Sequence, residues 1–135
     1  MLSIYDEEHE LFRQSFRSFV RERMQPYYDD WDRAGIMPRE IYAEAGRYGF
    51  LGFAIPEEYG GGGTRDFRFN CVTAEEIAAA GPSGGALGMT LHTDITTPYF
   101  LDYATPDQKA RWLPGIASGE LITAIAMTER GTGSD

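Results

Sequence analysis

Residues 6–20 read Asp-Glu-Glu-His-Glu-Leu-Phe-Arg-Gln-Ser-Phe-Arg-Ser-Phe-Val, and this stretch decides the fold class. Apolar side chains recur in it at spacings of three and four, at Leu11, Phe12, Phe16, Phe19 and Val20, while arginines occupy other faces. Such a period is typical of an amphipathic α-helix that packs one face on a core. Asp6 is suited to cap the helix, and the acids of its first turn are favoured by the helix dipole.

Further helices are expected along most of the chain. Pro26 should kink or end the first one, because proline cannot continue a helix undisturbed. Thr105 followed by Pro106 resembles a helix start, with a cap and then proline at the first position. The expected helical stretches cover residues 27–35, 38–47, 66–80, 82–103 with a break at Pro98, and 105–118.

The connections and the end of the chain differ from this pattern. Residues 50–56 are apolar and short, which predicts extended chain or a turn, and the four glycines at 60–63 predict a flexible turn. Residues 121–127 (Leu-Ile-Thr-Ala-Ile-Ala-Met) form the first credible strand. One strand cannot form a sheet by itself. We therefore expect a mainly α fold of five or six helices over residues 1–119, with residues 120–135 as the start of a β domain.

Composition excludes several classes of protein. The 135 residues carry 12 basic and 21 acidic side chains, a net charge of −9, and so lack the basic surface of a nucleic-acid-binding protein. Cys71 is the single cysteine, which rules out a disulfide within the chain and a cysteine-based metal site. No apolar run is long enough for a membrane helix, and the acidic start is unlike a targeting peptide. A cytoplasmic protein without membrane insertion is expected.

The stretch with the clearest chemical signal is residues 126–135, Ala-Met-Thr-Glu-Arg-Gly-Thr-Gly-Ser-Asp. The expected strand leads into a turn in which Gly131 and Gly133 can expose backbone N–H groups. A concave group of amides suits an anionic oxygen, and Ser134 adds a hydroxyl donor. An ordinary hairpin turn would show the same Gly-x-Gly-Ser letters, so this stretch taken alone decides nothing.

Several motifs in one register resemble acyl-CoA dehydrogenases. Besides Thr128-Glu129-x-Gly-x-Gly-Ser-Asp, residues 49–61 are similar to that family's Gly-Leu-Leu-Gly…Pro-Glu-Glu-Tyr-Gly-Gly segment, and Glu8-x-x-x-Phe12-Arg13 is similar to its start. Leu91-His92, Pro98, Gln108-Lys109 and Leu113-Pro114 are closest to the long-chain branch. The resemblance covers nearly the whole chain, in order.

The resemblance implies a flavoenzyme that uses FAD to dehydrogenate the Cα–Cβ bond of an acyl-CoA and passes electrons to an electron-transferring flavoprotein. Such an enzyme has three domains, α then β then α, and forms a homodimer or homotetramer. By the same resemblance the flavin would be bound by Ile125, Ala126, Met127, Thr128, Gly133 and Ser134. Ser134, Thr90 and His92 would contact the substrate. The catalytic base would lie beyond residue 135, so no residue here is assigned a catalytic role and the chain alone should be inactive.

The same helices are compatible with other functions. An acyl-CoA oxidase or flavin-dependent monooxygenase on the same scaffold, or a non-catalytic helical interaction module, would share these helices. The two histidines, His9 and His92, are too few for a metal site; His9 is expected in solvent, and His92 has packing as its alternative role. Glu75 and Glu76 are expected to be surface charges. Arg130 stands where the family usually has proline, which leaves the turn's conformation open.

Overall fold

The computed structural model describes residues 4–81 and 83–133, and helices form most of this part of the chain. The α-helices are α1 (Glu7–Phe19), α2 (Tyr28–Ala34), α3 (Arg39–Arg47), α4 (Arg68–Ala79), α5 (Ser83–Thr90), α6 (Thr97–Tyr103) and α7 (Pro106–Ser118). Two π-helical segments, η1 (Val20–Met24) and η4 (Leu91–Thr96), and two 3-10 segments, η2 (Gln25–Tyr27) and η3 (Glu57–Tyr59), complete the set. The helical prediction is confirmed in type and in order, but the described residues contain seven α-helices, more than the five or six expected.

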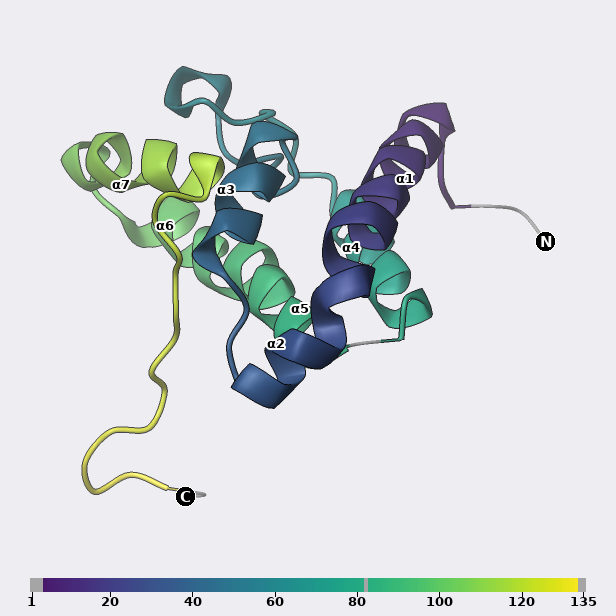
Figure 1. The fold of residues 1–135 in the computed structure, drawn as a ribbon. Coiled ribbons are helices and arrows are strands. Elements are labelled where there is room, and N and C mark those ends of the chain that lie inside the picture. The colour runs from purple at the N-terminus through teal and green to yellow at the C-terminus, as the bar shows by residue number, and fades with distance from the viewer. Residues whose placement is uncertain (1–3, 82, 134–135) are drawn as a thin grey trace.

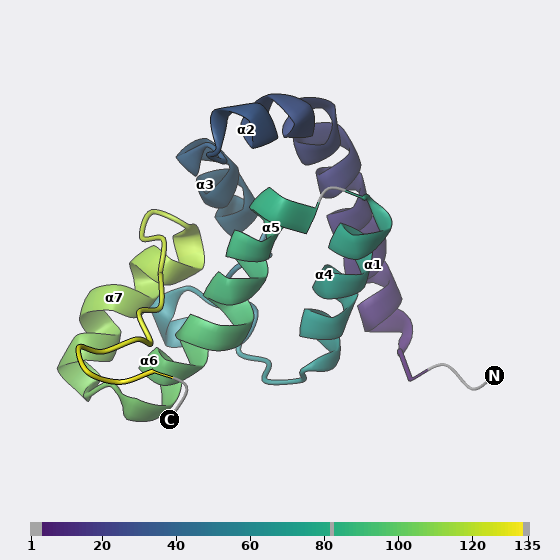
Figure 2. The same cartoon turned by 90° about the horizontal axis from the view of Figure 1, so that it is seen from below.

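Helices α1 and α4 lie side by side, and α3 and α7 pack together on the other side of α5 (Figures 1 and 2). The main core fills the space between these groups, and Phe16, Met24 and Ala45 are among its most buried residues. In a smaller cluster, Ile55 packs against Leu113, Ile116 and Ala117 of α7. Full burial of one such large apolar side chain contributes about 1.5–3 kcal/mol. Leu11, included in the predicted apolar stripe, is 58% exposed, because it lies about 100° around the helix from Phe12 and about 140° from Phe16.

Each π-helical segment ends two residues before a proline. Pro26 follows η1 and Pro98 follows η4. Proline has no N–H and its ring crowds the carbonyl four residues earlier, so the preceding turn widens instead of continuing as α-helix. At η4 the Thr97 N–H bonds the His92 carbonyl, five residues back. The break predicted at Pro98 is thus a widened turn, and helix resumes at once as α6.

The glycine turn at residues 60–63 is held firmly, contrary to the predicted flexibility. The N–H groups of Gly61, Gly62 and Gly63 donate to the carbonyls of Pro56, Gly52 and Ile55 at 2.9–3.2 Å. A Cβ on Gly61 would collide with the Ile55 carbonyl. Glycine is required here for close backbone approach, so the run serves packing more than mobility.

Helices α3 and α7 approach closely at two glycines. A Cβ on Gly46 would meet the backbone carbonyl of Ser118, and one on Gly119 would meet that of Tyr42. Gly119 also ends α7 in the left-handed conformation, with φ +76°. At its other end α7 begins as predicted, with Thr105 and Gln108 forming a reciprocal capping box.

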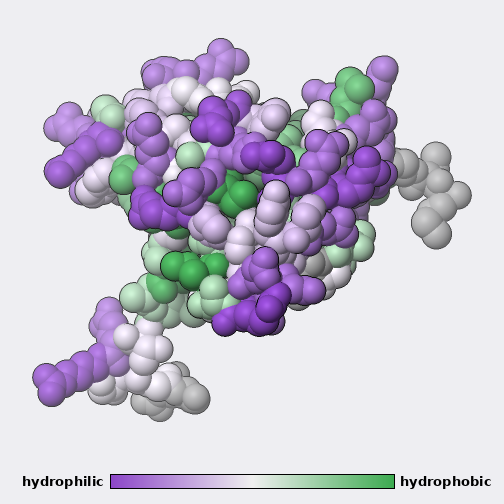
Figure 3. Space-filling model, viewed as in Figure 1, coloured by the Kyte–Doolittle hydropathy of each residue, from purple (hydrophilic) through white to green (hydrophobic). Residues whose placement is uncertain are grey.

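The C-terminal segment leaves the helical body as irregular chain (Figure 1). Residues 121–127, predicted to be a strand, form no β-ladder with any other described residue. A strand exists only when another strand accepts and donates its hydrogen bonds, and none of the described residues supplies such a strand beside this segment. Figure 3 shows a largely hydrophilic face, with hydrophobic side chains gathered near the point where this segment departs.

Candidate functional site

A cleft of about 380 Å³ lies between α6 and the C-terminal segment. Thr96, Tyr99 and Phe100 line one wall, and residues 124–127 line the other. The cleft thus includes Ile125, Ala126 and Met127, three of the residues predicted to bind a flavin. Tyr99 and Phe100 were not predicted as site residues, because the sequence pattern around them indicated only that they belong to a helix.

The backbone along this wall has free hydrogen-bonding capacity. Among the described residues, no group accepts a hydrogen bond from the N–H groups of residues 124–128. Thr128 itself is exposed. Unpaired amides beside a cleft with one aromatic wall suit a planar ligand that presents carbonyl or ring-nitrogen acceptors. The arrangement therefore fits the edge of a flavin ring.

Beyond Thr128 the chain makes a glycine-containing turn. The Thr132 N–H donates to the Glu129 carbonyl at 3.2 Å, and Thr132 Oγ1 accepts from the Glu129 N–H at 3.2 Å. Gly131 has φ +88°, which favours glycine at this position. Arg130 and Gly133 are exposed, and the predicted role of Ser134 falls outside the described residues.

His92 lies at a junction of three segments and is fully buried. Its Nδ1 accepts from the Thr123 N–H at 3.2 Å and lies 3.0 Å from Thr123 Oγ1, while its Nε2 is 3.1 Å from the Ile116 carbonyl. A backbone N–H can only donate, so Nδ1 carries no proton and Nε2 donates to Ile116. Burial lowers the pKa of His92, which keeps the ring neutral.

Thr90 borders a small apolar cavity together with Phe16, Met89 and Thr93. Its hydroxyl donates to the Leu87 carbonyl at 3.0 Å, within its own helix. The structure therefore brings Thr90 to the core side of α5, whereas the cleft at α6 is lined by other residues.

Asp94 is an acidic group that sequence reasoning did not single out. It lies in η4, where Asn70 Nδ2 donates to its Oδ1 at 2.6 Å and Thr93 Oγ1 does so at 2.5 Å. Burial raises the pKa of Asp94. The bond between Asn70 and Asp94 connects α4 to η4. These residues are distant in the sequence, so no local motif predicts their contact.

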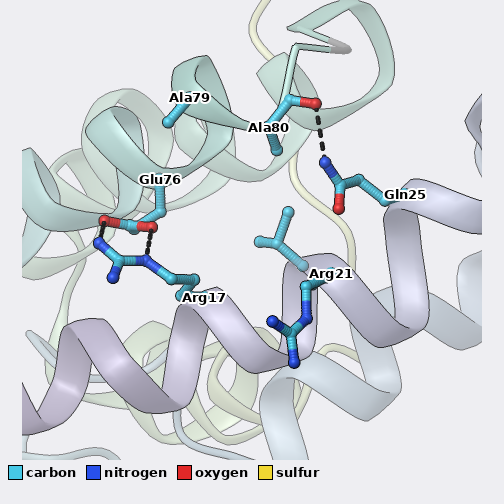
Figure 4. Close-up of a pocket in the computed structure, with 7 residues that line it drawn as sticks. Arg17, Arg21, Gln25, Glu76, Ala79 and Ala80 are labelled. Carbon is cyan, nitrogen blue, oxygen red and sulfur yellow. Dashed lines mark hydrogen bonds and ion pairs between the residues drawn. The ribbon is translucent and has the colours of Figure 1, made fainter.

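A second hollow lies between α1 and α4, and the residues that line it bond to one another across the two helices (Figure 4). Arg17 holds Glu76 with two bonds of 2.7 and 2.8 Å, and Gln25 Nε2 donates to the Ala80 carbonyl at 3.1 Å. Arg13 Nη1 also donates to Glu76 Oε1, at 3.0 Å. The prediction of Glu76 as a surface charge was wrong: its side chain is 5% exposed and joins two helices.

His9 was also predicted wrongly, since it is fully buried and not in solvent. Its Nδ1 accepts from the Asp6 N–H at 3.2 Å, and its Nε2 is 3.3 Å from Asp66 Oδ2. The His9 ring stacks near that of Phe69, with centroids 4.4 Å apart. Asp6, Glu8 and His9 are near one another, but the bond between His9 and the Asp6 backbone explains their grouping as the start of a helix.

The fold and the cleft define a class: a helical domain whose last helices and outgoing segment enclose one side of a cleft. Residues 6–120 match the family described as "Acyl-CoA dehydrogenase, N-terminal domain". The chain belongs to this family, as its sequence motifs predicted.

Individual relatives agree with this assignment. The chain is 42% identical to the rat mitochondrial long-chain specific acyl-CoA dehydrogenase over 132 residues, covering 98% of this chain and 30% of the rat protein. An acyl-CoA dehydrogenase structure from Geobacillus kaustophilus superposes with a TM-score of 0.91 at 46% identity, covering 100% of this chain and 35% of that one. An acyl-CoA dehydrogenase from Bacillus anthracis, solved with FAD, gives 0.80 at 29% identity over 98% of this chain and 23% of that one. The chain thus spans about a third of the length of its relatives.

Proposed function

We propose that this chain is the amino-terminal part of a flavin-dependent acyl-CoA dehydrogenase, an enzyme that removes hydrogen from the Cα–Cβ bond of an acyl-CoA. The observation that carries the proposal is the cleft at α6, which is lined by Tyr99 and Phe100 and by residues 124–127, whose backbone N–H groups have no acceptor among the described residues. Membership of the family and the FAD in the Bacillus anthracis relative support the same conclusion.

FAD would supply the chemistry by accepting a hydride from the substrate. The part of this chain is to bind and orient it. Ile125, Ala126 and Met127 would lie along the ring, and the Thr128 hydroxyl and backbone would donate to it near N5 and the pyrimidine edge. Such donors stabilise the negative charge that a reduced flavin gains.

The remaining site residues extend the proposal beyond the cleft. Gly133 and Ser134 would bind the pyrophosphate region, and Ser134 would also touch the CoA arm. Thr90 would form part of the wall of the acyl cavity. We place the boundary of the helical domain near residue 119, with residues 120–135 beginning the β domain.

The rest of the enzyme would complete the site and supply the glutamate base. We also propose a cytoplasmic homodimer or homotetramer that reduces an electron-transferring flavoprotein. Within the described residues, no helix combines the length and apolar character that crossing a membrane requires.

The test is expression of the full-length protein that contains this chain. Visible flavin absorbance in the purified protein, bleached by an acyl-CoA without oxygen, is the expected result. Thr128→Val keeps the shape of the side chain and removes its hydroxyl, so it should weaken FAD binding by roughly ten-fold, the value of about one hydrogen bond. A protein without flavin would instead favour a non-catalytic module, and rapid reoxidation of the bleached flavin by air would favour an oxidase.

A further inference from the structure

The polar atoms of His92 are all engaged by the protein itself. Nε2 donates to the Ile116 carbonyl near the end of α7, and Nδ1 accepts from Thr123 in the outgoing segment. The ring is fully buried, with Tyr42 as its aromatic neighbour at 6.2 Å between centroids. A side chain in this state has no donor or acceptor left for a substrate.

The backbone that carries His92 is held as firmly as its ring. The His92 carbonyl accepts from the Thr97 N–H across the π-turn, from Thr97 Oγ1 at 2.6 Å and from Thr96 Oγ1 at 3.1 Å. Thr96 Oγ1 in turn contacts Thr123 Oγ1. The widened turn, the end of α7 and the outgoing segment therefore meet in one hydrogen-bonded junction.

Thr123 stands directly before the cleft-lining residues. The next four residues, 124–127, form the second wall of the cleft, and their own N–H groups have no partner among the described residues. The Leu121 N–H donates to the Gly115 carbonyl at 2.9 Å, and the bonds of Thr123 are the last hydrogen bonds by which the described part of this segment is tied to the helices.

We propose that His92 is a positioning residue that sets the place of residues 124–127 at the flavin cleft by holding Thr123, instead of contacting the substrate. The proposal rests on the proposed function for its flavin part. It replaces the substrate contact predicted for His92 with an indirect role. The neutral Nε2–H form is required, because a proton on Nδ1 would face the Thr123 N–H.

The chain offers a matched control in its other buried histidine. His9 in α1 is equally buried, but it bonds the Asp6 N–H and lies beside Asp66, and it forms no hydrogen bond or ion pair with the described residues of the outgoing segment. His92→Leu removes a buried ring bonded at both nitrogens, and His9→Leu removes one with a hydrogen bond at Nδ1 and a contact of Nε2 with Asp66, so both should destabilise the fold. Only His92→Leu should change the segment before the cleft.

The experiment measures two quantities in the full-length protein and its variants: the Kd for FAD added to the apoprotein, and amide exchange over residues 121–127. We expect His92→Leu to raise the FAD Kd and the exchange rate of the Thr123 amide by roughly ten-fold each. His9→Leu should leave both near the unsubstituted values. His92→Gln, which keeps a donor and an acceptor and is less prone to misfold, should fall between the unsubstituted protein and His92→Leu.

Equal effects of His92→Leu and His9→Leu on both quantities would overturn the proposal, because the changes would then reflect lost stability alone. Unchanged exchange at Thr123 in His92→Gln and His92→Leu would overturn it as well. If the unsubstituted protein binds no FAD, the proposed function fails together with the flavin part of this inference. The exchange rates would then decide by themselves whether His92 anchors the segment.

Discussion

Replacement of Gly119 by alanine tests the close packing of α3 against α7. Gly119 ends α7 with φ +76°, and a Cβ there would collide with the backbone carbonyl of Tyr42 in α3. The left-handed conformation by itself costs a residue with a side chain about 1–2 kcal/mol. The collision adds about 1–3 kcal/mol, the usual cost of forcing extra atoms into a packed site.

Two other glycines separate these effects. Gly35 and Gly49 have φ values of +68° and +79°, but a Cβ on either meets nothing within 4 Å. Gly35→Ala and Gly49→Ala should therefore show only the conformational cost of about 1–2 kcal/mol. Gly119→Ala should lose about 2–5 kcal/mol altogether.

Equilibrium urea unfolding followed by far-UV circular dichroism measures the difference. With a slope of about 1–3 kcal/mol per molar urea, Gly119→Ala should unfold roughly 1 M earlier than the two control variants. In thermal unfolding, the Tm of Gly119→Ala should lie below that of the two control variants by roughly 3–5 °C for each kcal/mol of difference in stability. Coincident transitions for all three variants would refute the close approach of α3 and α7 at Gly119.

Two further predictions concern the interface of α1 with α4 and the smaller core. Glu76→Gln removes a carboxylate held by Arg17 and Arg13, and should lower the free energy of unfolding by about 1.5–3 kcal/mol at neutral pH. Arg17, more than Arg13, holds the pKa of Glu76 below its ordinary value of 4.5, so the stability from this contact is present above that pH and is lost as the pH falls through the lowered pKa. The acid limb of a stability–pH curve should consequently be flatter in Glu76→Gln, and an unchanged limb would contradict this assignment. Leu113→Ala opens a cavity at a fully buried site and should lower the free energy of unfolding by about 2–5 kcal/mol. Leu87→Ala, at a side chain 63% exposed, should lower it by less than about 0.5 kcal/mol in the same urea assay. Similar losses of stability from both would place Leu113 outside the core.

Local signals predicted the helices well. Three signals were confirmed: the three-and-four spacing at residues 12–20, the helix starts at prolines near residues 38 and 106, and the cap at Thr105. Each depends on residues within one or two helical turns of one another. Helix formation depends mainly on such short-range contacts, so it can be read from consecutive residues. The motifs near residues 49–61 and 126–135 also identified the family correctly.

Partners distant in sequence were beyond such reasoning. His9 was expected in solvent and Glu76 at the surface, because polar side chains are usually exposed. Both are buried, since Asp66 lies against His9 and two arginines of α1 meet Glu76 across 59 to 63 residues of chain. The glycine turn at 60–63 was expected to be flexible for the same reason: its acceptors at residues 52, 55 and 56 are brought to it by the fold.

By itself, then, the sequence determined where helices begin and end and which family the chain belongs to, because capping, periodicity and motifs are properties of adjacent residues. The tertiary structure decided which polar groups are buried and that His92 holds Thr123. It also decided that residues 121–127 form no strand among the described residues. A hydrogen bond between distant segments, or a strand within a sheet, exists only once another part of the chain supplies its partner.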